Sequence, residues 1–533
     1  MLKTTLKKII ITIAMVSVAS SSFGCGDSNN PSNPLDKPNV EEPLIEWEPC
    51  PLITEPCPSG DELHCFSDDS TLDAECAFVQ LPASYNDPLG PKLEVFLKRK
   101  KAIQPSVGQL WLLMGGPTTS VALEPAIEIF EYLREDLDIY LIERRGFGRS
   151  TLLRCPEQEA ENSPGGKTIT IDELVDCTAF LEEKHGRLEY FRTTYAAYDV
   201  DHLIQAMRKD DDEVYIYGTS YGTFWLNRFL QVTSQPVDGL IFDGGCGPGD
   251  CSFNSASAVL GWDATGRRLL RQCAEDERCG SYLPDPEETL ARLYEKLDNG
   301  HCPALGISSE TLYNIVSIML TELDLRDYIP SLIYRIDRCE QRDIEALTKL
   351  LHPTNFPEAE DAFIQHHSEF TSDHITFNEM WIKPAPEFTP EERAKYDNRL
   401  FGEFTSSKSY IDRMAAWPAS YDADEFAGQI AKTDLPVLFL HGTLDAQSPF
   451  EVADPFGQSF DGPNQNYIYV YDAGHFVLQN SPLADYPEFS CGMDLVGQFL
   501  NDPKAELDTS CIYGVTPLNF DARELYGTDD AWN

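Results

Sequence analysis

The most informative stretch of the sequence reads Val214-Tyr215-Ile216-Tyr217-Gly218-Thr219-Ser220-Tyr221-Gly222-Thr223-Phe224-Trp225-Leu226. A β-branched and aromatic run leads into the pattern Gly-x-Ser-x-Gly, and an apolar segment of helical character follows it. The pattern alone arises by chance about 0.2 times in a chain of this length, so its place between a strand and a helix carries the information. The two glycines relieve crowding around a strained turn that exposes a serine hydroxyl. Ser220 is therefore predicted to be a nucleophile.

A serine hydroxyl needs a base to take its proton, and the base needs a carboxylate to orient it. In strand–turn–helix sites of this kind, the acid and then the histidine follow the serine along the chain. Asp445 comes just after a strand-like apolar run, and His475 follows the next such run. Both side chains are expected at the carboxyl edge of a parallel sheet, beside Ser220. We predict a triad of Ser220, Asp445 and His475, with Asp243 and Asp472 as alternative acids.

The oxyanion of an acyl-transfer intermediate needs two backbone N–H donors. Tyr221 offers one donor because it directly follows the serine. The second donor is expected from Gly115-Gly116-Pro117, after an early apolar run, because glycine lets the backbone approach a substrate closely. We assign the second donor to Gly116, with Gly115 as the other choice.

Eight short segments, several of them continuously apolar, predict strands that alternate with helical segments. The predicted strands are Ala77 to Leu81, Leu93 to Leu97, Leu110 to Met114, Ile139 to Glu143, Glu213 to Tyr217, Leu240 to Asp243, Val437 to His441 and Tyr467 to Tyr471. The pattern becomes helical between residues 251 and 430, for instance over Glu287 to Leu297 and Thr311 to Leu325. We therefore predict an α/β fold with a mostly parallel sheet of about eight strands. Its core comprises residues 47–250 and 431–533, and residues 251–430 form an inserted, mostly helical cap.

Residues 1–25 have the features of an export signal. Three lysines precede the apolar run Ile9 to Ala19, which is shorter than the roughly 20 residues that span a bilayer. Cys25 is predicted to be lipidated, and cleavage among the small residues 19–22 is the alternative. Residues 26–46 are polar and rich in proline and asparagine, as expected of a flexible tether. We expect a bacterial cell-envelope protein that contacts the membrane only through the lipid at Cys25, or a secreted protein if Cys25 carries no lipid.

The chain of 533 residues has 88 acidic and 41 basic side chains, a formal net charge of −47. This charge argues against nucleic acid as a partner, because nucleic-acid binding relies on cationic side chains. Hydrophobic residues make up 42 % of the sequence, which is enough for a large core. With Cys25 lipidated, 14 of the 15 cysteines remain for up to seven disulfides, as expected of an exported protein.

The motifs together resemble those of secreted α/β-hydrolase peptidases of the proline iminopeptidase and tripeptidyl aminopeptidase group. The matching residues are Gly115-Gly116-Pro117, Glu143-Arg144-Arg145-Gly146-Phe147-Gly148-Arg149-Ser150, Gly218-Thr219-Ser220-Tyr221-Gly222, Gly442-Thr443-Leu444-Asp445 and Gly474-His475. The resemblance extends from about Trp47 to Cys511, and it implies an α/β-hydrolase fold, a helical cap and cleavage of peptides near a free amino terminus. Thr118 stands where the family has glycine, and Met114 where iminopeptidases have histidine.

An aminopeptidase needs a carboxylate to bind the ammonium group of its substrate. Glu379 aligns with an acidic motif that lines the cap of such enzymes, and a solvated surface carboxylate is the alternative reading. His366, His367, Glu369 and His374 form a His-rich tract without a visible closed set of ligands, so we expect no metal and no other cofactor. The leading hypothesis is a serine aminopeptidase with peptide substrates. A carboxylesterase with the same triad and a non-catalytic surface binder are the alternatives.

Overall fold

The computed structural model describes residues 42–54, 72–209, 211–233, 235–249, 251, 255–355, 365–382, 389–402 and 408–533. The predicted signal, Cys25 and the tether up to residue 41 lie outside these ranges. Ile45, near the end of the predicted tether, already packs against the core. Among the helices of the described ranges, none combines the length and apolar character needed to cross a bilayer.

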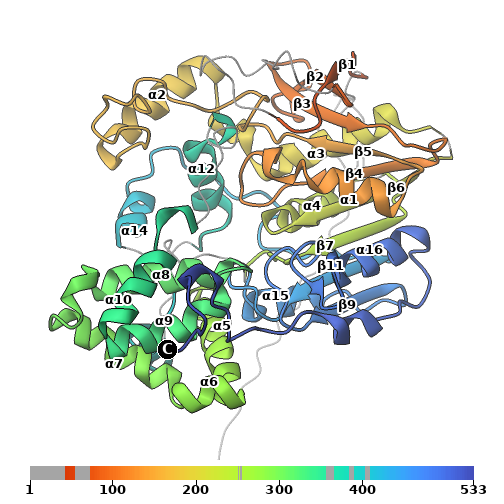
Figure 1. Ribbon diagram of the computed structural model, residues 1–533. Coiled ribbons are helices and arrows are strands. Elements are labelled where there is room, and N and C mark those ends of the chain that lie inside the picture. The colour runs from red at the N-terminus through yellow and green to blue at the C-terminus, as the bar shows by residue number, and fades with distance from the viewer. Residues whose placement is uncertain are drawn as a thin grey trace, which may run out of the picture. The chain divides into compact units, whose positions relative to one another are not determined.

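A nine-stranded sheet forms the centre of the fold, in the order β1-β2-β3-β5-β4-β6-β7-β8-β9 (Figure 1). The strands are β1 (Glu48–Cys50), β2 (Ala74–Pro82), β3 (Lys92–Lys100), β4 (Gly108–Leu113), β5 (Leu137–Ile142), β6 (Glu213–Thr219), β7 (Gly239–Asp243), β8 (Val437–Gly442) and β9 (Gln465–Val470). Pairs among β1, β2, β3 and β5 are antiparallel, and all pairs from β5 to β9 are parallel. The α/β-hydrolase fold expected from the sequence is confirmed.

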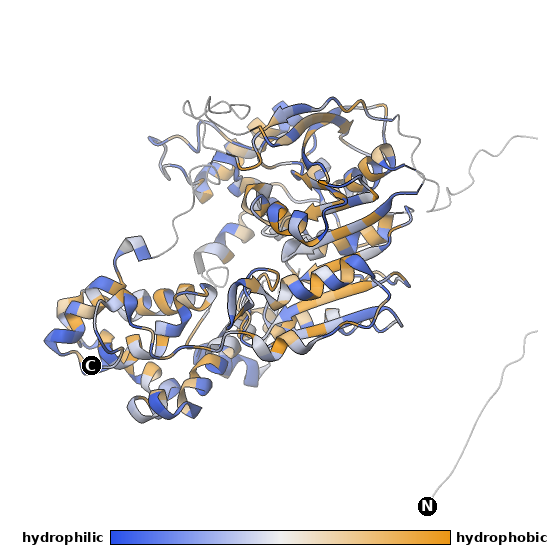
Figure 2. Ribbon diagram, turned by 45° about the vertical axis from the view of Figure 1, so that its right-hand side comes forward, coloured by the Kyte–Doolittle hydropathy of each residue, from blue (hydrophilic) through white to orange (hydrophobic). Residues whose placement is uncertain are grey.

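Helices cover both faces of the sheet, which explains why its central strands are continuous apolar runs. Residues Trp111 and Leu113 of β4 face a cluster with α3 (Thr193–Met207) and α4 (Tyr221–Val232). The alternate residues of β4 face α1 (Ala126–Leu133) and α16 (Cys491–Asn501) on the other side. Figure 2 shows the hydrophobic stretches along these strands. Two buried layers therefore hold the carboxyl ends of the parallel strands at one edge.

A mostly helical region separates β7 from β8. Its helices are α5 (Ala256–Glu275), α6 (Glu277–Tyr282), α7 (Pro286–Asp298), α8 (Ser309–Thr321), α9 (Ile329–Arg338), α10 (Gln341–Leu350), α12 (Glu369–Glu379), α13 (Pro390–Asp397) and α14 (Lys408–Ala415). Helices α5 to α10 share a core that the C-terminal Trp532 completes. Helices α12 and α14 pack in a second cluster with α2 (Leu174–His185). The remaining α-helix of the described residues is α15 (Phe450–Gly457), and β10 (Pro482–Leu483) and β11 (Tyr486–Ser490) form a two-stranded sheet.

Six disulfides link cysteines of the described residues. The pairs are Cys50–Cys76, Cys155–Cys177, Cys246–Cys251, Cys273–Cys279, Cys302–Cys339 and Cys491–Cys511. The remaining three of the 15 cysteines, Cys25, Cys57 and Cys65, lie outside the described ranges. Disulfides persist in oxidising compartments, so the bridges indicate an exported protein.

Candidate active site

Ser220 lies on the turn between β6 and α4, with φ 53° and ψ −126°. Residues other than glycine rarely adopt these backbone angles, and the neighbouring glycines make room for them here. A Cβ on Gly222 would lie 2.1 Å from the carbonyl oxygen of Leu113, and a Cβ on Gly218 would lie 2.5 Å from that of Gly222. The N–H of Ser220 donates to the carbonyl of Asp243 at 2.9 Å. The strained turn is thus tied to the next strand of the sheet.

Asp445 and His475 form a buried pair on the loops after β8 and β9. Their side chains are 0 % and 4 % exposed, and 2.8 Å separates Asp445 Oδ2 from His475 Nδ1. The other carboxylate oxygen, Oδ1, accepts from the N–H of Ser448 at 2.8 Å. Burial lowers the pKa of His475, but the Asp445 carboxylate outweighs it and holds the pKa above its usual value. Asp445 therefore both orients the imidazole and stabilises its protonated form.

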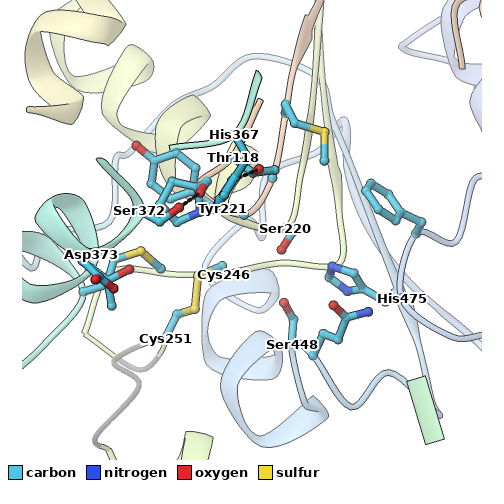
Figure 3. Close-up of a pocket in the computed structure, with 18 of the residues that line it drawn as sticks. Thr118, Ser220, Tyr221, Cys246, Cys251, His367, Ser372, Asp373, Ser448 and His475 are labelled. Atoms are coloured by element: carbon cyan, nitrogen blue, oxygen red, sulfur yellow. Dashed lines mark hydrogen bonds between the residues drawn. A yellow bond between two sulfur atoms is a disulfide. The ribbon is translucent and has the colours of Figure 1, made fainter. Parts of the chain in front are cut away.

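Ser220 and His475 line one pocket, and Figure 3 shows their side chains beside each other at this pocket. The structure thus brings together the three predicted triad residues. The alternative acid Asp243 has a different role, since its carboxylate accepts from the N–H groups of Val477 and Leu478 at 2.8 and 2.9 Å. Asp243 consequently anchors the chain directly after His475.

Gly244 completes the support of the pair, and sequence reasoning missed it. A Cβ at this position would lie 2.9 Å from both Cε1 and Nδ1 of His475 and 3.3 Å from Oδ2 of Asp445. The residue also has φ +64°, a conformation that glycine adopts at little cost. The signal in the sequence was the pair Gly244-Gly245 directly after a buried strand.

The predicted oxyanion donors Gly116 and Tyr221 both line the pocket. Tyr221 is the first residue of α4, so its N–H has no acceptor within the helix. Gly116 has φ +105° and is exposed. Gly115, the other choice, packs on the nucleophile, since a Cβ there would lie 2.7 Å from Ser220 Cβ. Backbone of Gly116 and Tyr221 is thus available beside Ser220.

The segment at the start of α12 holds the loop that carries Gly116. Ser372 Oγ donates to the carbonyl of Pro117 at 2.6 Å, and Thr118 Oγ1 lies 2.8 Å from His367 Nδ1. Thr118 stands where the resembled family has glycine, and its hydroxyl contacts His367 of the His-rich tract. Burial lowers the pKa of His367 to about 4, so the imidazole is neutral at pH 7.

The rest of the His-rich tract points elsewhere. His374 Nε2 lies 3.0 Å from the carbonyl of Leu188, and Glu369 forms a 3.0 Å ion pair with Arg413. Among the residues that the structure describes, no group of three or more histidine, cysteine or acidic side chains is arranged to hold a metal ion.

Glu379 is hydrogen-bonded to residues that are not among those lining the pocket. Its Oε1 accepts from the N–H of Thr193 at 2.8 Å and from the hydroxyl of Tyr421 at 2.6 Å, and the described residues that line the pocket do not include it. The acidic side chain of α12 that does line the pocket is Asp373. Positions 372, 373 and 376 of α12, and position 380 directly after it, line the pocket, and position 379 lies near the edge of the same helical face, so helical periodicity alone did not single out Asp373.

Asp373 is a buried carboxylate beside Arg413. Arg413 Nε donates to Asp373 Oδ2 at 2.6 Å, and the same guanidinium pairs with Glu369. Burial raises the pKa of Asp373 to about 6, although Arg413 opposes the shift. Above pH 6, two carboxylates share one guanidinium, which leaves this side of the pocket negatively charged.

Sequence and structure similarities relate the chain to known proteins. No family model matches it. It is 24 % identical over 295 residues to "Serine protease Hip1" of Mycobacterium tuberculosis (strain ATCC 25618 / H37Rv) and of Mycobacterium bovis, and the match covers 51 % of this chain and 53 % of each relative. The chain thus spans about half the length of the curated relatives it matches.

The similar solved structures include an esterase from Exiguobacterium antarcticum, with 14 % identity, coverage of 72 % of this chain and 89 % of the other, and a TM-score of 0.28. A lipase in its open form has 11 % identity, coverage of 78 % and 96 %, and a TM-score of 0.32. At such low TM-scores the fold assignment rests on the strand order and the turn at Ser220. The chain has the α/β-hydrolase fold and is a distant sequence homologue of a serine protease.

Proposed function

We propose that the chain is an exported serine aminopeptidase that releases residues or short peptides from free N-termini. Ser220 Oγ attacks the scissile carbonyl while His475 takes its proton and Asp445 holds the ring. The N–H groups of Gly116 and Tyr221 bind the developing oxyanion. His475 then protonates the leaving amine, and the C–N bond breaks to leave an acyl group on Ser220. Water deprotonated by His475 attacks this ester, and the acid product leaves as Ser220 recovers its proton.

The observation that carries the peptidase assignment is Asp373, a carboxylate that lines the same pocket as Ser220 and His475. A desolvated ammonium group needs a paired anion. The net negative charge around Asp373, Glu369 and Arg413 supplies one. A neutral ester gains nothing from this charge, so the pocket fits a substrate with a free amine better.

Two further findings support the proposal. The sequence similarity to a serine protease favours peptides as the substrate class, and the six disulfides favour export. We propose in addition that Cys25 carries a lipid that anchors the protein at the bacterial cell envelope, as its own sequence context suggests.

The test compares anilides of short Ala and Pro peptides with and without an N-acetyl group, and a p-nitrophenyl ester panel beside them. We expect free-amine anilides to be cleaved, acetylated ones to be poor substrates, and Ser220→Ala to abolish turnover. Asp373→Asn should raise KM about tenfold or more for free-amine substrates, since a charge-assisted contact is lost. Glu379→Gln is the matched variant on the same helix, and it should leave KM near the wild-type value.

Each other outcome points to a different conclusion. Ester turnover without peptide cleavage would establish a carboxylesterase instead. Turnover of neither class, in a protein that folds normally, would favour a non-catalytic binding protein. A rise in KM in Glu379→Gln but not in Asp373→Asn would return the amine site to Glu379.

A further inference from the structure

Four sulfur-containing residues line the proposed active-site pocket. The disulfide Cys246–Cys251 lines the pocket, and so do Met114 and Met380. The two cysteines are only 3 % and 8 % exposed, so this exposure is directed into the pocket that they line. In the view of Figure 3 the bridge is drawn between Ser220 and Asp373. A substrate that contacts both of these residues occupies a pocket that the disulfide also lines.

The bridge is held at a defined position relative to the nucleophile. The N–H of Cys246 donates to Thr223 Oγ1 at 2.7 Å, and this hydroxyl donates to the carbonyl of Ser220 at 2.6 Å. The N–H of Cys251 donates to the carbonyl of Gly247 at 3.0 Å. Two hydrogen bonds thus connect one end of the bridge to the backbone of Ser220.

Close packing behind the loop prevents it from moving away from the pocket. A Cβ on Gly245 would lie 2.0 Å from Phe439 Cζ, and a Cβ on Gly247 would lie 2.7 Å from Phe456 Cβ. The loop therefore rests directly on buried aromatic rings. Because protein interiors are close-packed, Gly245 and Gly247, and with them Cys246, have little room to move away from the pocket.

We propose that the Cys246–Cys251 disulfide determines specificity, because it contacts the side chain of the residue whose carbonyl Ser220 attacks and favours aromatic and large apolar side chains there. This inference rests on the proposed function, in which the substrate ammonium binds at Asp373. Sulfur is polarisable and contacts aromatic rings favourably. A charged side chain at the same place loses its water and gains no partner from the bridge.

The first measurement uses the wild-type protein with free-amine anilides that differ only in this residue: Phe, Leu, Ser and Asp. We expect kcat/KM to be at least tenfold higher for Phe and Leu than for Ser, and lowest for Asp. Equal or higher kcat/KM for Ser or Asp would overturn the proposal without any variant.

The second measurement replaces the bridge by Cys246→Ala with Cys251→Ala. We expect the Phe-to-Ser ratio of kcat/KM to fall by about 2- to 13-fold, the range of one sulfur–aromatic contact. The matched control is Cys273→Ala with Cys279→Ala. Its bridge has a sequence separation of 6 against 5, its cysteines are 0 % exposed, and it belongs to the core of α5 to α10.

The Phe-to-Ser ratio should stay unchanged in this control, because the Cys273–Cys279 bridge is not among the described residues that line the pocket. Removal of either bridge opens a loop of nearly the same length, so the two variants should lose similar amounts of stability. An unchanged ratio in the Cys246/Cys251 variant, or an equal fall in the control, would overturn the proposal. The same ratio is measured with p-nitrophenyl 3-phenylpropanoate and acetate. If peptides are not cleaved at all, the proposed peptidase function fails. The ratio of kcat/KM for the phenylpropanoate ester to that for the acetate ester then still tests the contact between an aromatic acyl group and the Cys246–Cys251 disulfide.

Discussion

A methyl group at residue 244 would press on the proposed catalytic pair, because no space separates Gly244 from the His475 ring. The added Cβ would lie 2.9 Å from two ring atoms, and the backbone has φ +64°. We expect Gly244→Ala to lower kcat about 100-fold with a smaller change in KM, since a misplacement of about 1 Å has an effect of this size. Steady-state kinetics on the best anilide measures it.

Gly166→Ala is the matched control for this backbone conformation. Gly166 has φ +65°, and a Cβ there would meet nothing within 4 Å. Both variants place a side chain on a backbone with positive φ and so have a similar conformational cost. They differ in the contacts of the added Cβ with His475 and Asp445, which exist only at residue 244. A kcat for Gly244→Ala within threefold of wild type, or an equal loss in Gly166→Ala, would contradict the predicted contact.

The pKa values of Asp373 and His475 lead us to expect two separate effects of pH, one on KM and one on kcat/KM. The pKa of Asp373 is raised to about 6 by burial, so acidification through pH 6 removes the negative charge, and KM for free-amine peptides should rise. Burial lowers the pKa of His475, yet Asp445 keeps it above 6.5. Protonated His475 accepts no proton, so kcat/KM should fall on the acid side with a midpoint above 6.5 for peptides and esters alike.

Asp373→Asn separates the two effects. The variant should lose the dependence of KM on pH near 6 and keep the acid limb that belongs to His475. An ester without an amine should show the His475 limb alone in both proteins. A wild-type KM that is constant from pH 5 to 7.5 would rule out the role of Asp373 in amine binding.

At the scale of elements, a buried charge cluster joins the N-terminal segment to β3. Glu124 Oε1 accepts from Lys98 Nζ at 2.6 Å and from Arg149 at 3.0 Å. The other oxygen, Oε2, accepts from the N–H of Thr54 at 2.6 Å, and Lys98 Nζ also donates to the carbonyl of Leu52. Burial lowers the pKa of Lys98 to about 8, although Glu124 opposes the shift. The cluster thus depends on the one carboxylate that both cations contact.

Glu124→Gln should destabilise the protein by about 3–5 kcal/mol, because it leaves two buried cations without their anion. Chemical unfolding followed by fluorescence measures the change. Glu391→Gln is the control, since Glu391 pairs with Lys395 at an 80 % exposed position, where ion pairs contribute little. A loss below 1 kcal/mol in Glu124→Gln would show that the cluster does not hold the segment.

Element prediction from the sequence succeeded where the local pattern and the packing agree. All eight predicted strands are present, and the central ones were the clearest because β4, β6, β7 and β8 are nearly continuous buried runs between two helical layers. The ninth strand, β1, was missed because it has three residues, includes Pro49 and lies at the edge of the sheet. The helix predicted up to Leu325 ends at Thr321, and a 3₁₀ turn follows at Arg326–Tyr328.

The candidate site was predictable only in part, for a related reason. Ser220, Asp445 and His475 follow strands at fixed places in the topology, so local motifs found them. Asp373 and the Cys246–Cys251 disulfide depend on how the inserted helices pack over the sheet edge. No local pattern contains that packing, and motif alignment selected Glu379, which lies further along α12 and is hydrogen-bonded to Thr193 and Tyr421.

At the scale of the whole molecule, the formal net charge of −47 opposes the folded state. Like charges repel one another more strongly in the compact chain than in the extended one. Salt screens this repulsion, since the Debye length falls from about 30 Å at 0.01 M to about 3 Å at 1 M. Buried pairs such as Asp445 with His475 are screened much less, so the surface charge should dominate the response.

We therefore expect the thermal unfolding midpoint at pH 7.5 to rise by several degrees between 0.01 and 0.5 M NaCl. At about pH 4.5, where many carboxylates are protonated, the same salt step should have a much smaller effect. Differential scanning calorimetry at both pH values provides the comparison. Equal rises at the two pH values would assign the effect to general salt stabilisation, and a fall at pH 7.5 would mean that attractive surface ion pairs outweigh the net repulsion.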